Sequence, residues 1–417
     1  MYIKRAAEES VLKISETFPV LLVTGPRQAG KTTLLSKLAD ESRTYVSLDD
    51  PDIRRMARSD PALFMQRFTP PLLIDEIQYA PQILPYIKMS VDKSGNMGGF
   101  WLTGSQAFHM MKNVGESLAG RVGIVNLLGL SKSEIDGLPS EPFTTSPERL
   151  MRRMKQTKKA GINEIYELIF RGAFPALHRV NPPELPEFYR SYINTYLQRD
   201  IKDLSQVADE TAFYNFMIIA AARTARPVIY EDMAKDAGIS QPTAKKWLSV
   251  LVSSGLAALV QPYHNNALKR AVKMPLLHFL DTGLCAYLLK WGSPETLEHG
   301  AMSGAFFESW VFSEIYKSYI NAGKEAPVYY YRDREKREID LLLYGNGTLY
   351  PVEIKKSASP GTKAVKTFTT LNPVTEPERF GAPGQYKAEI GNGAVICMTN
   401  DLLPADNKNW FVPAWLI

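Results

Sequence analysis

The stretch that decides the fold is FPVLLVTGPRQAGKTT, residues 18–33, which runs directly into LLSKLADES. Residues 18–25 are apolar and end in a glycine, which predicts a short buried strand of a parallel sheet. Residues 25–32 match the pattern G-x-x-x-x-G-K-S/T, and helix-forming residues follow them. A strand, a glycine-rich loop and the start of a helix, in this order, predict a phosphate-binding loop.

The chemistry of this loop explains its spacing. Glycines let backbone N–H groups curl around phosphates, and the helix N-terminus adds a positive dipole end. We expect Lys31 to reach the outer phosphates and the Thr32 hydroxyl to ligate Mg²⁺. We therefore expect ATP and Mg²⁺ as cofactors, with ATP hydrolysis as the activity. The expected nucleotide-binding residues are Gly25, Pro26, Arg27, Gln28, Ala29, Gly30, Lys31, Thr32 and Thr33.

A second apolar run, PLLIDE at residues 71–76, ends in two carboxylates. Because the carboxyl ends of parallel strands gather ligand groups at one edge of a sheet, we expect both carboxylates near the phosphates. Asp75 would hold the magnesium and its hydration shell. Glu76 stands where a base could polarise the attacking water.

Three further residues have more than one interpretation. The run FWLTGS, residues 100–105, ends in the hydroxyls of Thr103 and Ser105, and either could contact the γ-phosphate or the attacking water. Ser105 could equally be the N-cap of a helix. Arg121, in SLAGR, is either an arginine finger acting on the nucleotide of a neighbouring subunit or an ordinary surface arginine. The finger role would require a homo-oligomer.

Length and composition describe a globular protein of several domains. With 417 residues the chain exceeds a single hydrophobic core, and its charged fraction of 22% is ordinary. The net charge of +5 is a weak sign of nucleic-acid binding. Cys285 and Cys397 lie in apolar surroundings, which predicts buried thiols in a reducing compartment. We find no secretory signal and no apolar stretch of about 18–20 residues, so we expect a cytoplasmic protein with no membrane partner.

The order and spacing of these motifs carry a family resemblance. GPRQAGKT, LLIDEIQ, FWLTGS and SLAGR resemble the AAA+-type ATPase domain found in many uncharacterised bacterial and archaeal ATP-binding proteins, in which a C-terminal domain of unknown function follows. The resemblance continues through TYLQRDI, HFLDTGL, EIDLLL and VEIKK, and so covers essentially the whole chain. It implies a parallel AAA+-type P-loop sheet with a helical lid, within an α/β fold.

The middle of the chain is expected to hold two units. Residues 1–145, before this middle part, would be the ATPase domain. The first middle unit, residues 146–205, would be a helical lid or connector, where Arg199 is either a nucleotide sensor or a salt-bridge residue. Residues 206–299 read as a winged helix-turn-helix with a linker, because a glycine turn separates two helical patterns and a strand follows. This element either contacts DNA or serves as a packing module. Its second helix would present Gln241, Thr243, Lys245 and Lys246.

Residues 300–417 are expected to form a nuclease-like α/β domain. Glu308 opens an apolar helix, Asp340 lies in EIDLLL, and Glu353 and Lys355 share one face of the strand VEIKK. This set resembles the PD-(D/E)-x-K nucleases. The resemblance implies a second Mg²⁺ or Mn²⁺ site at Glu308, Asp340 and Glu353, with Lys355 as a catalytic residue.

The leading hypothesis is an ATP-dependent switch or motor that drives a C-terminal effector acting on DNA or RNA, with or without cleavage. One alternative is an ATP-gated nucleic-acid-binding protein that does not cleave. Another is a signalling or defence ATPase whose C-terminal part binds protein.

Overall fold

The computed structural model describes residues 2–104, 117–196, 209–263, 274–333, 335, 337–371 and 388–417. Ser105 and Arg199, two residues with candidate roles, lie outside these ranges. Both cysteines are buried free thiols, as expected. None of the helices among the described residues is long and apolar enough to cross a membrane.

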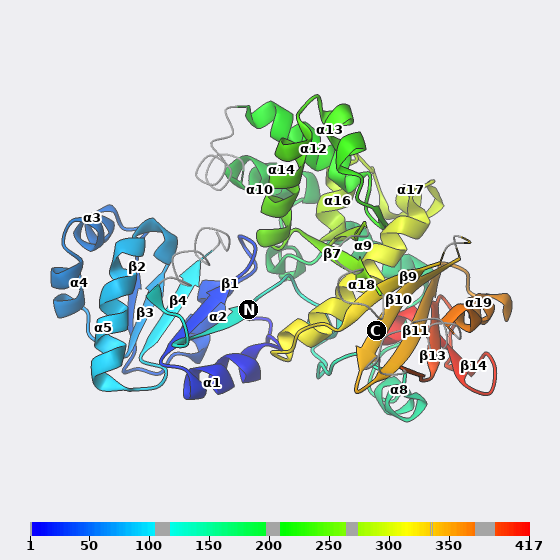
Figure 1. Cartoon of the computed structure of the whole chain (residues 1–417), viewed down its shortest axis with the longest axis horizontal. Coiled ribbons are helices and arrows are strands. Elements are labelled where there is room, and N and C mark those ends of the chain that lie inside the picture. Colours follow the sequence, from blue (N-terminus) through cyan, green and yellow to red (C-terminus); the bar gives the residue numbers. More distant parts are fainter. Residues whose placement is uncertain are drawn as a thin grey trace, which may run out of the picture.

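The N-terminal part is built on a five-stranded sheet in the order β2-β3-β4-β1-β5 (Figure 1). All its pairings are parallel, and Val20 of β1 lies opposite Phe100 of β4 on one side and Val122 of β5 on the other. Strand β1, which lies between β4 and β5, is the one expected from residues 18–25. The strands are β1 (Val20–Thr24), β2 (Thr44–Ser47), β3 (Leu72–Asp75), β4 (Phe100–Gly104) and β5 (Val122–Asn126).

Helices cover both faces of this sheet. Val20 and Leu22 of β1 belong to the core under α4 and α5, whereas Leu21 and Val23 belong to the core under α1 and α2. Alternate residues of a strand point to opposite faces, so a strand covered on both sides must be apolar throughout. The helices are α1 (Glu8–Thr17), α2 (Lys31–Leu38), α3 (Pro51–Ser59), α4 (Pro61–Arg67) and α5 (Leu84–Ser94), with the 3₁₀ turns η1 (Ile77–Tyr79) and η2 (Pro81–Ile83).

A largely helical region follows, which runs from teal through green to yellow in Figure 1. Helix α13 ends at Gly238, whose φ of 65° is left-handed, and α14 begins after Ser240, whose hydroxyl accepts the Thr243 N–H. Strand β7 comes next, which is the order of elements expected for residues 208–262. The helices are α7 (Lys132–Ile135), α8 (Pro147–Met154), α9 (Ile162–Arg171), α10 (Leu185–Thr195), α12 (Glu210–Ala221), α13 (Tyr230–Ala237), α14 (Gln241–Ser253), α16 (Thr282–Leu288) and α17 (Pro294–His299), with η3 (Pro175–His178) after α9.

The C-terminal part is a mixed sheet beside the long helix α18 (Ser303–Asn321), with the order β14-β15-β13-β11-β10-β9-β7-β8-β6 and β12 beside β11. Strands β9, β10 and β11 are antiparallel, and β13 joins β11 in parallel after the short helix α19 (Lys363–Lys366). The strands are β6 (Arg226–Pro227), β7 (Ala257–Pro262), β8 (Leu276–Phe279), β9 (Val328–Arg332), β10 (Glu338–Gly345), β11 (Thr348–Lys355), β12 (Glu389–Ile390), β13 (Gly393–Cys397), β14 (Leu403–Pro404) and β15 (Asn409–Pro413); the turns η5 (Thr367–Leu371) and η7 (Ala414–Leu416) complete it.

The middle and C-terminal parts share one hydrophobic core. A single cluster of buried residues extends from Leu128 to Ile417, and the parallel pairing of β7 with β9 makes one continuous sheet of the two parts. Helix α18 (yellow in Figure 1) runs from this core to the first sheet. At the C-terminal end of α18, the Asn321 carbonyl accepts a 2.7 Å hydrogen bond from the Ser10 hydroxyl of α1. The expected domain limits at 145, 205 and 299 stay predictions.

Buried His278 makes the stability of this shared core depend on pH. Its ring stacks on Phe312, its Nδ1 lies 3.2 Å from Ser309 Oγ, and burial lowers its pKa from 6.5 to about 3. Between these values the unfolded chain takes up a proton that the folded chain does not. The free energy of unfolding should therefore fall with falling pH in this window, by up to about 1.4 kcal/mol per pH unit.

We expect His278→Gln, which cannot take up that proton, to show a shallower loss of stability between pH 6.5 and pH 4 in denaturant titrations. His299→Gln is the matched control, because His299 is exposed. A slope that is the same in wild type and His278→Gln would contradict the assignment.

Candidate functional site

The expected phosphate loop follows β1 and needs glycine at both ends. Gly25 has a φ of 137°, and a Cβ there would stand 2.0 Å from the Leu127 carbonyl oxygen. Gly30 has a left-handed φ of 91° and is the N-cap of α2. Only glycine adopts such conformations without strain, so these two positions allow the loop to turn tightly between strand and helix.

Lys31 lies buried at the start of α2, inside the loop. Its Nζ donates to the carbonyl oxygens of Gly25 and Pro26 at 3.0 and 2.9 Å. The ammonium group is therefore held over the inner side of the loop, where the backbone N–H groups and the helix dipole also favour an anion. This is the location expected for a lysine that contacts the outer phosphates.

Asp75, at the end of β3, accepts hydrogen bonds from three hydroxyl groups. Thr32 Oγ1 donates to Asp75 Oδ1 at 2.8 Å, Thr103 Oγ1 donates to the same oxygen, and the Tyr45 hydroxyl donates to Oδ2 at 3.1 Å. A carboxylate beside a threonine hydroxyl at the N-terminus of α2 is the hard oxygen set that Mg²⁺ prefers. The residues present thus fit the magnesium that the sequence predicts.

Glu76 follows Asp75 in a strained conformation. Its φ of 58° is left-handed, which is uncommon for a glutamate and typical of functional sites. The Glu76 N–H donates to Thr103 Oγ1 at 3.1 Å, and its carboxylate accepts from the Gln78 amide. Burial raises the pKa of Glu76, while the nearby Lys31 charge lowers it. A poorly solvated carboxylate beside the loop can accept a proton from water, as a general base does.

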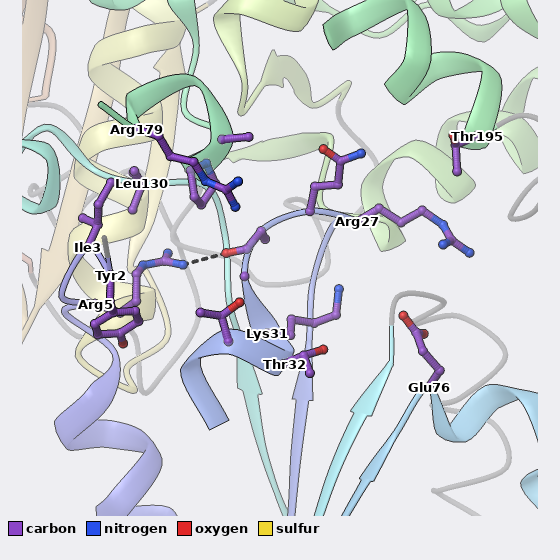
Figure 2. A pocket seen from close by; sticks show the side chains of 16 residues that line it. Tyr2, Ile3, Arg5, Arg27, Lys31, Thr32, Glu76, Leu130, Arg179 and Thr195 are labelled. Atoms are coloured by element: carbon purple, nitrogen blue, oxygen red, sulfur yellow. Dashed lines mark hydrogen bonds between the residues drawn. The ribbon is translucent and has the colours of Figure 1, made fainter. Parts of the chain in front are cut away.

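A cavity of about 510 Å³ opens over the loop (Figure 2). Figure 2 shows Arg5 on one side of Lys31 and Glu76 on the other. Residues to which the sequence analysis gave no role close the remaining walls: Tyr2, Ile3, Arg5, Leu130, Pro175, Ala176, Arg179 and Thr195. Sequence reasoning missed all of them, because they come from segments far from the loop in the chain. Arg27, Gln28 and Thr33, expected on sequence grounds, line the cavity as well.

Arg121 lies at the opposite end of the sheet from the loop. It directly precedes β5, which runs parallel to β1, so it stands beside Val20, at the start of β1, and not beside Gly25. Its guanidinium pairs with Asp92 at the end of α5 and donates to the Ala119 carbonyl. Arg121 therefore cannot reach a nucleotide in its own loop, and the role on a neighbouring subunit stays a prediction.

A second cluster of charged side chains forms where α18 meets β10 and β11. Asp340 Oδ2 accepts the Ile354 N–H at 2.7 Å, and Lys355 Nζ lies 2.5 Å from Glu353 Oε1 and 3.9 Å from Asp340 Oδ2. Burial, and next the Asp340 charge, raise the pKa of Glu353 to about 7. The pKa of Glu308 on α18 is raised well above its usual value by the same causes.

The structure brings Glu308, Asp340, Glu353 and Lys355 together but does not itself define a metal centre. Across the described ranges, no group of three or more histidine, cysteine, aspartate or glutamate side chains is arranged to hold a metal ion. The Lys355 ammonium stands between the carboxylates, while buried Glu353 Oε2 has no hydrogen-bond partner among the described residues. Metal binding at Glu308, Asp340 and Glu353 stays a prediction.

Comparisons with known proteins agree with the P-loop assignment. Residues 17–136 match the family described as "AAA domain". Residues 162–295 match "Domain of unknown function (DUF8612)", and residues 303–417 match "Domain of unknown function (DUF4143)". Uncharacterized proteins of Mycobacterium tuberculosis and Mycobacterium bovis are each 27% identical over 404 residues, which is 96% of this chain and 84% of theirs.

The Walker-type ATPase of Pyrococcus abyssi is 14% identical, with a TM-score of 0.41 over 68% of this chain and 94% of its own. The ADP form of ORC2 from Aeropyrum pernix is 12% identical, with a TM-score of 0.28 over 62% and 87%.

The parallel sheet, the phosphate loop and the AAA domain define a P-loop ATPase. More particularly, residues 17–136 match the AAA domain family, and a mixed-sheet domain forms the C-terminal part of the chain. This confirms the expected class of protein and its enzymatic activity.

We expect Glu76→Gln to bind ATP as wild type does but to hydrolyse it about 10²–10⁴-fold more slowly, because an amide cannot accept the proton of water. Lys31→Ala is the contrasting variant and should lose nucleotide binding itself. Calorimetry measures the binding of ATP, and phosphate release measures its hydrolysis. Because burial raises the pKa of Glu76, wild-type turnover should fall on acidification below that raised pKa. Wild-type turnover by Glu76→Gln would assign the base elsewhere.

Proposed function

We propose that the chain is an ATP-driven switch or motor whose nucleotide state controls a nucleic-acid-facing C-terminal half, with metal-dependent cleavage at Glu308, Asp340, Glu353 and Lys355. One observation carries the proposal: α18, which contributes Glu308 to the charged cluster, is bonded directly to the segment that forms a wall of the nucleotide cavity. The two sites therefore share a rigid element.

The roles at the phosphate loop follow from the contacts above. Lys31 contacts the outer phosphates, and Thr32 with Asp75 holds Mg²⁺, which supplies charge neutralisation at the phosphates when bound. Glu76 accepts the proton of the attacking water. The Thr103 hydroxyl positions both acidic residues, because it donates to the Asp75 carboxylate and accepts the Glu76 backbone N–H. The base and ribose lie against the apolar walls formed by the N-terminal segment and residues 175–176, since these complete the cavity beyond the loop.

The connection between the sites runs through a buried ion pair on α18. Glu314 Oε2 accepts the Lys132 N–H at 2.7 Å, and Lys317 Nζ donates to the Leu130 carbonyl at 2.8 Å. The two side chains pair with each other at 2.6 Å and are almost fully buried. Leu130 lines the nucleotide cavity, so a nucleotide-dependent shift of this wall would move α18. Glu308 lies on the same helix, six residues before Glu314, and would move with it.

Element order and charge support a PD-(D/E)-x-K-like site. A helix with Glu308, a strand with Asp340 and a neighbouring strand with Glu353 and Lys355 occur in the order that the resemblance implies. Two carboxyls with raised pKa values and an unpartnered Glu353 oxygen fit a divalent cation. Glu308, Asp340 and Glu353 would hold it, and the ion would supply Lewis acidity. Lys355 would stabilise negative charge at the reacting phosphate.

The helix α14 provides the proposed nucleic-acid face. Gln241, Lys245 and Lys246 are exposed near its start, where DNA-reading helices make base contacts. A DNA or RNA partner is proposed on this ground, with residues 206–299 as a winged helix and residues 146–205 as the lid. A homo-oligomer, with Arg121 acting on a neighbour, belongs to the same proposal.

A second candidate is an ATP-gated binding protein that does not cleave. The Lys355 ammonium already neutralises Glu353 at 2.5 Å without a metal, which favours this alternative. The two candidates differ in one measurable respect, the integrity of the nucleic acid.

We expect the full-length protein with ATP and Mn²⁺ or Mg²⁺ to cut DNA or RNA, and Lys355→Gln to cut about 10²–10³-fold more slowly. We expect Mn²⁺ to raise the melting temperature of the wild type, and Asp340→Asn to lose this stabilisation. Both variants should hydrolyse ATP normally, because the phosphate loop is elsewhere. Intact nucleic acid under all ion conditions, with retention at low salt, would favour the non-cleaving alternative.

The coupling is tested by replacing the buried pair as a unit. Removing one partner would leave a buried charge, whereas Glu314→Gln with Lys317→Met keeps size and removes both charges. We expect this double variant to bind ATP normally but to lose the difference in nucleic-acid affinity between ATP and ADP. Glu141→Gln with Arg152→Met, at an exposed pair, is the control. A double variant that keeps the wild-type difference would refute the connection.

A further inference from the structure

Arg5 is a buried arginine in the wall of the nucleotide cavity that contacts the backbone of the phosphate loop. Its Nη1 donates to the Ala29 carbonyl at 2.7 Å and its Nη2 to the Leu128 carbonyl at 2.8 Å, while Nε donates to Glu134 Oε1 at 2.9 Å. The side chain is only 3% exposed. Figure 2 shows Arg5 beside the loop, with its bond to Ala29 dashed. No motif of the sequence pointed to this residue.

Glu134 holds the guanidinium in place. Besides Arg5 Nε, its Oε1 accepts the Ala6 N–H at 2.7 Å, and its Oε2 accepts the Ser131 N–H at 2.7 Å. The glutamate side chain is 1% exposed, so both charges are out of water and compensated. A planar guanidinium with fixed partners on three sides has one orientation. The Ala29 carbonyl must therefore point toward the Arg5 Nη1 to accept its hydrogen bond.

The bond to Ala29 controls a donor on the other side of the loop. The carbonyl of Ala29 and the N–H of Gly30 belong to one planar trans peptide unit, so they point in opposite directions. Fixing the carbonyl toward Arg5 therefore turns the Gly30 N–H away from Arg5. Gly30 has a left-handed φ of 91°, and without an anchor a glycine peptide rotates easily.

We propose that Arg5, oriented by Glu134, is a positioning residue for nucleotide binding, which fixes the Ala29–Gly30 peptide so that its N–H faces the phosphates. Its positive charge is paired with Glu134, so it acts through the loop backbone and not as a direct phosphate ligand. The Gly30 N–H would bind the phosphates equally in the ground state and in the transition state. Loss of this interaction raises KM and leaves kcat largely unchanged.

The test is Arg5→Lys in the full-length protein, because lysine keeps the charge next to Glu134 but cannot make three bonds in a fixed plane. We expect KM for ATP and the Kd for ADP to rise about 10-fold, with kcat per folded molecule within about 3-fold of wild type. Arg5→Gln should raise KM further, so that lysine partly rescues the loss.

Arg43→Lys is the matched control, since Arg43 packs over Trp101 in the same domain, at 4.0 Å, and does not line the cavity. It should keep the wild-type KM. A merely structural role for Arg5 would lower the melting temperature and the folded fraction but leave KM unchanged. Wild-type KM in folded Arg5→Lys would overturn the proposal. If neither Arg5 variant folds, Glu134→Gln decides, and a wild-type KM in that variant would overturn it equally.

Discussion

The close contact between the phosphate loop and residues 127–134 is the constraint on which the rest of this structure depends. Gly25 approaches the Leu127 carbonyl so closely that no side chain fits, and the Leu127 N–H in turn donates to the Thr24 carbonyl at 2.8 Å. Arg5 then joins the loop to Leu128. The other side of the segment is bonded to α18, so the ATPase sheet and the C-terminal core are built against one common strip of backbone.

The two acidic sites of the molecule differ in how their charges are compensated. Asp75 accepts three hydroxyl hydrogen bonds, which hold its carboxylate in place before any ligand arrives. Glu308 and Glu353 are instead buried close to Asp340, and their pKa values are raised. Carboxyls so placed gain much from a cation, whether it is the Lys355 ammonium or a metal ion. The first site is thus preorganised for its ligand, and the second responds to the cation that is present.

Much of the fold and of the first site could be predicted from the sequence, because the signals are local. The run at residues 18–25, the glycine spacing of the loop and the position of Asp75 all depend on neighbouring residues, and the parallel sheet confirms the expected strand. The second site was only partly within reach. Strand periodicity correctly brought Glu353 and Lys355 to one face, but only the packing of α18 against β11 brings Glu308 to them.

What the sequence determined by itself is therefore the phosphate loop, its strand and helix, and the class of ATPase, since short-range sterics and hydrogen bonding specify each of them. Only the tertiary structure decided that Arg5 would reach Glu134, 129 residues away, and that Lys317 would bond to Leu130 across 187 residues. It also decided that Arg121 lies at the far end of the sheet. Contacts of this range have no sequence signature, because they form only when separate elements bury their apolar faces together and bring the remaining polar groups within hydrogen-bonding distance.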